Sequence, residues 1–110
     1  MAESRASYDA SHRDRVNLVI HLLAVPLFVA AAAAFAWSAL RSDPDGILAA
    51  LAALGVSLAA QGVGHRREQV RPAPFDGVID FATRVPVEQF WGFWVFLLSG
   101  AWWRRLRARG

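Results

Sequence analysis

Residues 22–64 read LLAVPLFVAAAAAFAWSAL-RSDPDG-ILAALAALGVSLAAQGVG, and this stretch decides the fold. The first run, residues 22–40, contains no charge, and Ser38 is its one polar side chain. The second run, residues 47–64, is also uncharged. A helix needs about 20 such residues to cross the hydrocarbon core of a membrane, and both runs reach or approach that length. The polar turn between them is so short that the two predicted helices must be antiparallel neighbours.

We therefore expect an all-α integral membrane protein with a single domain over residues 1–110. An antiparallel transmembrane hairpin is expected at its centre, joined by an interfacial helix and a C-terminal membrane helix. The expected elements are a polar N-terminal segment at 1–11, helix one at 14–40, helix two at 47–68, the interfacial helix at 75–84 and helix three at 86–106. The alternative is a soluble helical bundle, but 110 residues form too small a core to cover both apolar runs on every side.

The arginines predict an orientation. They flank the start of the first run and the end of the second, whereas the turn holds Arg41 with two aspartates. By the positive-inside rule, the polar ends of the hairpin face the cytoplasm, and we expect a bacterial inner membrane. The tail conflicts with this rule, because residues 104–109 carry four arginines that would lie outside if the last helix spans once. Either that helix is re-entrant or tilted, with its tail back inside, or the rule fails here.

Composition excludes some classes of function. The chain has no cysteine, which rules out disulfides, thiolate metal sites and cysteine nucleophiles. Lysine is absent, so arginine supplies the excess positive charge, and the pI of about 11.0 raises nucleic-acid binding as an alternative. Arginine beside tryptophan at a helix end is more typical of membrane anchoring, with guanidinium on lipid phosphate. We expect membrane lipid and no nucleic acid as a partner, and the sequence does not indicate an oligomeric state.

Three histidines lie in two polar clusters at the ends of the apolar runs. His12 and His21 are at the start of the first run, and His65 follows the second with Glu68 close behind. In an antiparallel hairpin these ends meet, so we expect ring nitrogens of His21 and His65 within about 5 Å of each other. Three imidazoles and a carboxylate form a metal-ligand set. The alternative is that the histidines are ordinary interfacial residues, with His65 and Glu68 paired to nearby arginines.

Other polar residues surround these four. Asn17 lies four residues before His21, and Gln61 four before His65, so each shares a helix face with a histidine and is predicted to orient it. Three arginines beside the predicted site are candidates to hold a carboxylate head group: Arg66, Arg67 and Arg71. The alternative is that they are ordinary cytoplasmic flanking charges.

These clusters resemble two motifs of the 2-hydroxy-palmitic-acid dioxygenase-like membrane family. The first motif is Tyr8-Asp-Ala-Ser-His12 followed by Asn17, His21 and Pro26, and the second is Gln61-Gly-Val-Gly-His65-Arg-Arg-Glu68 with Pro72. The resemblance covers about residues 8–90 and implies a membrane-embedded Fe(II)-dependent dioxygenase that shortens 2-hydroxy fatty acids by one carbon.

The resemblance also implies a cofactor and roles for the site residues. It places His12, His21, His65 and Glu68 at an iron site as catalytic residues, with zinc as a surrogate metal and molecular oxygen as co-substrate. The alternative from another class is a non-enzymatic membrane scaffold or lipid-binding protein.

Overall fold

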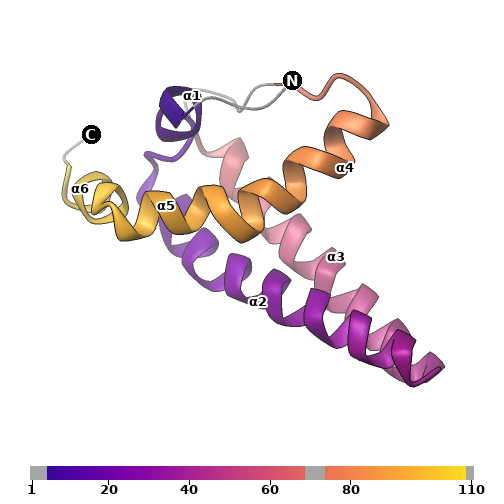
Figure 1. Ribbon diagram of the computed structural model, residues 1–110. Helices are drawn as coiled ribbons and strands as arrows, with labels where there is room; N and C mark the ends of the chain where they lie inside the picture. The colour runs from indigo at the N-terminus through magenta and orange to yellow at the C-terminus, as the bar shows by residue number, and fades with distance from the viewer. Residues whose placement is uncertain (1–4, 69–73, 109–110) are drawn as a thin grey trace.

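The computed structural model of the chain describes residues 5–68 and 74–108, and the fold over these residues is all-helical, as predicted (Figure 1). In chain order the elements are α1 (Arg5–Ala10), α2 (Arg15–Leu40), α3 (Pro44–Arg66), α4 (Val78–Val87), the π-helix η1 (Glu88–Gly92), α5 (Phe93–Leu98) and α6 (Ala101–Arg107). The long helices α2 and α3 lie side by side, and α4 to α6 cross them at the end away from their connecting turn (Figure 1).

The connection between α2 and α3 is shorter than predicted. The Asp43 side chain accepts a hydrogen bond from Gly46 N at 3.2 Å and thereby caps α3, which begins at Pro44 instead of residue 47. Proline suits this first helical position because its missing N–H would have no partner there. The residues expected to form a turn therefore form the first turn of the helix, and the chain reverses over Arg41–Asp43, with Ser42 at a φ of 52°.

Small residues and buried polar groups hold α2 against α3. Ser57 Oγ donates to the carbonyl of Ala24 across the helix pair at 2.6 Å. We call the end of the helix pair away from the connecting turn the open end. Nearer this end, Gly64 packs on Asn17 so closely that a Cβ at Gly64 would lie 3.0 Å from Asn17 Cγ. These pairs join early residues of α2 to late residues of α3, so the two helices run antiparallel.

The faces of α2 and α3 that point away from this seam are apolar and exposed. Both helices are long and apolar enough to cross a membrane, and a third or less of each apolar window is buried. Large exposed side chains run along both helices: Val19, Leu23, Trp37, Leu48, Val56 and Val63. The core helix of a soluble protein would bury most of such a surface.

The last third of the chain differs from the predicted interfacial helix at 75–84 and helix three at 86–106. The helical path is continuous from Val78 to Leu98, with Pro86 inside it, and it ends where Gly100 adopts a left-handed conformation with φ of 85°. The π-helix η1 follows Pro86 closely, and Trp94 Nε1 donates to the carbonyl of Gln89 at 2.8 Å. A π-turn leaves carbonyls poorly paired within the helix, and the indole satisfies one of them.

After the break at Gly100, α6 returns to the open end of the helix pair. Trp102 is buried, and its Nε1 donates to the carbonyl of Leu18 at 2.9 Å. Arg15 Nη2 donates to the carbonyl of Ala108 at 3.1 Å. The described end of the chain, up to Ala108, therefore lies beside the start of α2.

We predict that Gly64→Ala destabilises the helix pair whereas Gly62→Ala does not. A methyl at Gly64 would overlap the Asn17 side chain, and overpacking of this kind costs about 1–3 kcal/mol. A methyl at Gly62 meets nothing within 4 Å, so it is the matched control on the same helix. Thermal unfolding in the same detergent measures both variants, and equal melting temperatures would contradict this packing.

Candidate metal centre

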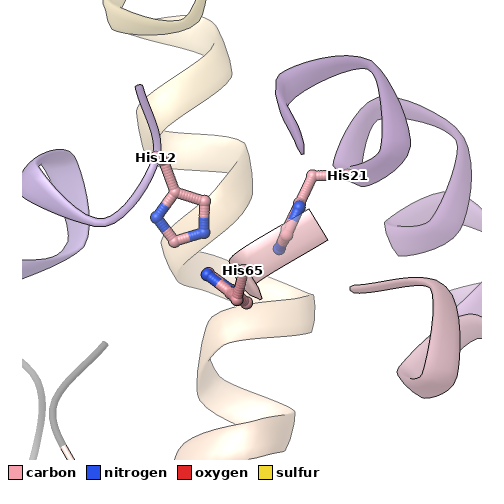
Figure 2. Close-up of side chains that lie close together, drawn as sticks. All are labelled: His12, His21 and His65. Carbon is pink, nitrogen blue, oxygen red and sulfur yellow. The ribbon is translucent and has the colours of Figure 1, made fainter. Parts of the chain in front are cut away.

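The three histidines converge at the open end of the helix pair. His12 comes from the link between α1 and α2, His21 from the second turn of α2 and His65 from the last turn of α3 (Figure 2). One ligand nitrogen from each ring lies within 4.8 Å of the others, which confirms the expected approach of His21 and His65. The ring centroids are 4.7–4.8 Å apart and the planes are nearly perpendicular, at 78–85°. The three rings therefore face one small volume, as ligands of a single ion would.

Backbone carbonyls orient two of the rings. His12 Nδ1 lies 2.6 Å from the carbonyl oxygen of Tyr8, and His21 Nδ1 lies 3.1 Å from that of Asn17. A carbonyl oxygen only accepts, so in each pair Nδ1 carries the proton and donates. This leaves Nε2 with a free lone pair, which is the form that binds a metal.

Burial favours the neutral form of the site. His12 and His21 are 3% and 2% exposed, whereas His65 is half-buried. Burial lowers the pKa of His12 well below its usual value, and repulsion from the other two imidazoles lowers that pKa further. His12 is therefore neutral at pH 7 and available as a ligand without loss of a proton. The donor set fits a borderline transition-metal ion such as iron or zinc.

Aromatic side chains enclose the rings. Tyr8 stacks on His12 with ring centroids 3.8 Å apart, and the ring centroid of Phe96 lies 5.8 Å from that of the same imidazole. Phe93 of α5 stacks on His21 at 6.5 Å. His12 and His21 are buried, whereas His65 as a whole is half-buried, although its Nδ1 is itself covered.

The structure does not bring Glu68, the predicted fourth ligand, into this group. Its carboxylate accepts from Arg13 N at 2.8 Å, from Asp14 N at 2.9 Å and from Asn17 Nδ2 at 2.7 Å. It thus binds the N–H groups just before α2, where a carboxylate is stabilised by unpaired donors. Glu68 holds the segment that carries His12 against the end of α3.

The side-chain amides of Asn17 and Gln61, predicted to orient imidazoles, form hydrogen bonds to other groups. Asn17 holds His21 through its backbone carbonyl, while its side chain donates to Glu68. Gln61 donates to Ser57 Oγ at 3.1 Å and exchanges two hydrogen bonds of 2.8 Å with Gln89 of η1. Gln61 therefore ties α3 to the π-helix, one turn before His65.

The arginines predicted to bind a head group lie in different surroundings. Arg66 is exposed at the end of α3. Arg67 Nε donates to the Asp14 carboxylate at 2.9 Å, an exposed ion pair that links the ends of α2 and α3. Arg71 lies outside the described residues.

Four residues around the centre had no predicted role: Tyr8, Gln89, Phe93 and Phe96. Gln89, Phe93 and Phe96 are spaced as one helix face, and Gln89 is a polar residue bordering an apolar run. That spacing was the available signal. The polar N-terminal segment predicted at 1–11 contains α1 from Arg5, in which Tyr8 is buried, and Ser11 and His12 just after this helix are also buried.

Comparison with known proteins gives one match. The family described as "2-hydroxy-palmitic acid dioxygenase Mpo1-like" matches residues 1–102, nearly the whole chain. Neither the curated proteins nor the solved structures contain a significant match to this chain.

We predict that Glu68→Ala releases the segment that carries His12. The variant removes the acceptor of the part-buried N–H groups of Arg13 and Asp14 and of the buried Asn17 side-chain amide, and an unpaired buried donor costs about 1–3 kcal/mol. Amide hydrogen exchange at Arg13 and Asp14 should accelerate, while exchange in the middle of α2 stays slow. Unchanged protection at these two amides would contradict the role of the carboxylate.

Proposed function

Because this chain belongs to the 2-hydroxy-palmitic acid dioxygenase Mpo1-like family, we propose that it is an Fe(II)-dependent membrane dioxygenase that shortens 2-hydroxy fatty acids by one carbon. The observation that carries the proposal is the convergence of three imidazoles on one volume, two of them buried with Nδ1 already held by a carbonyl. A site with three protein ligands leaves positions open for oxygen and substrate.

His12, His21 and His65 would hold the ion, with Glu68 as the residue that keeps His12 in place. A bound ferrous ion would supply the redox chemistry that lets oxygen react with a hydroxy acid. One 2-hydroxy acid and one O₂ would give the acid one carbon shorter, CO₂ and water, with cleavage of the C1–C2 bond. Tyr8, Phe93 and Phe96 would exclude water from the covered side of the site.

The substrate carboxylate would bind on the half-buried side of the site, beside His65. Arg66 is exposed one residue further along the chain, and Arg71 follows the same helix end in the sequence. Arg67 is engaged with Asp14, so Arg66 and Arg71 are the stronger candidates for this role.

We also propose that α2 and α3 span a membrane, with the histidine end on the cytoplasmic side. Support comes from the length of both helices and from the large side chains exposed along them. The charge distribution agrees, because α6 lies at the same end as Arg13, Arg15 and Arg66, and the connecting turn lies at the other. A site at the cytoplasmic end of two membrane-spanning helices suits an amphiphile, whose head group would bind at the ion while its acyl tail lies in the membrane.

We predict stoichiometric iron in anaerobically purified protein, with zinc able to replace it. His12→Ala, His21→Ala and His65→Ala should each lose the metal, because each removes one of three ligands. The Glu68→Gln variant should bind the metal more weakly but still retain it at saturating concentration, since this substitution removes no nitrogen ligand. Elemental analysis decides this, and wild-type protein without metal above background would defeat the proposal.

Asn17→Ala and Gln61→Ala should weaken metal binding less than any histidine change. Losses of supporting hydrogen bonds typically reduce affinity or activity about 10- to 100-fold. Metal titration of the two variants beside His21→Ala measures the difference. If either variant lost metal as completely as His21→Ala, the substituted residue would itself be a metal ligand.

Long-chain 2-hydroxy acids should be consumed with oxygen uptake, whereas short ones such as lactate should not. Burial of the tail contributes roughly 0.8 kcal/mol per methylene, which a water-soluble acid lacks. The measurement is oxygen uptake by iron-loaded protein across a chain-length series, with His65→Ala as the control. Equal turnover of short and long acids would contradict the proposal that the acyl tail of the substrate lies in the membrane. No uptake with any acid would favour the non-enzymatic scaffold.

A further inference from the structure

The exposed face of α6 combines an indole with two guanidinium groups. Trp103 is 52% exposed, and Arg104 and Arg107 are exposed on the same side of the helix, while Ala101 and Trp102 are buried on the other. No acidic residue follows Glu88 in the sequence. The positive charge of this face is therefore not neutralised by its own segment.

The position of this face is fixed relative to the apolar helices. The hydrogen bonds from Trp102 to Leu18 and from Arg15 to Ala108 hold α6 beside the first turns of α2. Leu98, just before the break at Gly100, is 82% exposed. The cationic face thus lies where an apolar surface gives way to a polar end, which is the level of lipid head groups if α2 and α3 span a bilayer.

We propose that Trp103, Arg104 and Arg107 form a binding surface for anionic phospholipid head groups. Guanidinium groups bind phosphate oxygens in a bidentate manner, and tryptophan prefers the boundary between acyl chains and head groups. Arg104 Nη1 donates to the carbonyl of Ser99 at 3.3 Å, and its other N–H groups can reach a phosphate. A soluble polyanion such as nucleic acid would leave Trp103 and Leu98 in water, so an amphiphile fits better.

This surface would hold the open end of the helix pair against a negatively charged leaflet. It would thereby keep the histidine site at the interface, where an amphiphilic substrate presents its head group. The inference rests on the proposed membrane insertion but not on the proposed reaction, since neither the arginines nor Trp103 contact a histidine ring.

The test is a lipid titration of detergent-solubilised protein by native mass spectrometry, with phosphatidylglycerol and phosphatidylcholine as probes. Wild-type protein should bind phosphatidylglycerol more tightly. Arg104→Gln and Arg107→Gln should each reduce that preference about fivefold, as expected for one arginine at an anionic surface. The matched control is Arg41→Gln, which removes an exposed arginine that lies over Trp37 at the opposite end of the molecule. It should leave the preference unchanged.

Separate outcomes distinguish the two proposals. If the protein enters phosphatidylcholine nanodiscs with full helicity but shows no preference for phosphatidylglycerol, the lipid surface is refuted and the membrane insertion stands. An equal loss of preference in Arg41→Gln would also refute it, because the effect would then follow from net charge alone. Failure to enter any bilayer would defeat both proposals.

Discussion

The carboxylate of Glu68 joins two segments that are more than fifty residues apart in sequence. It accepts the N–H groups of Arg13 and Asp14 and the side-chain amide of Asn17, and it is 6% exposed. His12 immediately precedes these N–H groups, and His65 lies one helical turn before Glu68. Because His12 is outside the long helices, the packing of α2 on α3 alone would not position it. The hydrogen bonds of Glu68 hold the backbone next to His12 at the end of α3, and the carbonyl of Tyr8 orients the ring itself.

Most of the buried polar side chains that the structure describes lie toward this end. Ser57, Gln61 and Gln89 are buried between helices and hydrogen-bonded to one another or to a backbone carbonyl, and the buried Asn17 side chain donates to Glu68. The Gln61–Gln89 pair joins η1 to α3, and the following helix α5 supplies aromatic side chains to the histidine site. Around them the outer faces of α2 and α3 remain apolar and exposed. This separation accounts for both a defined site and a surface suited to lipid.

The sequence predicted the parts of the fold that depend on local patterns. Two uncharged runs and a short connection sufficed to predict that His21 and His65 meet, because helix geometry carries each to the same end. The role of Glu68 was not predictable, since a carboxylate three residues after a histidine fits a ligand set as well as it fits a cap on a distant helix. The π-helix and the break at Gly100 depend on how the last third packs on α2, and tertiary packing leaves little local signal. The start of α3 at Pro44 did have a signal, an aspartate cap before proline, which was interpreted as a turn.

We propose that His12, His21 and His65, without the carboxylate of Glu68, provide the protein ligands of one metal ion. X-ray absorption spectroscopy of the iron-loaded protein and of its Glu68→Gln variant measures the coordination directly. Scattering from three imidazoles is expected in both samples, with the same first coordination sphere and a lower metal affinity in the variant. Fewer than three imidazoles, or an oxygen ligand that disappears in Glu68→Gln, would contradict it.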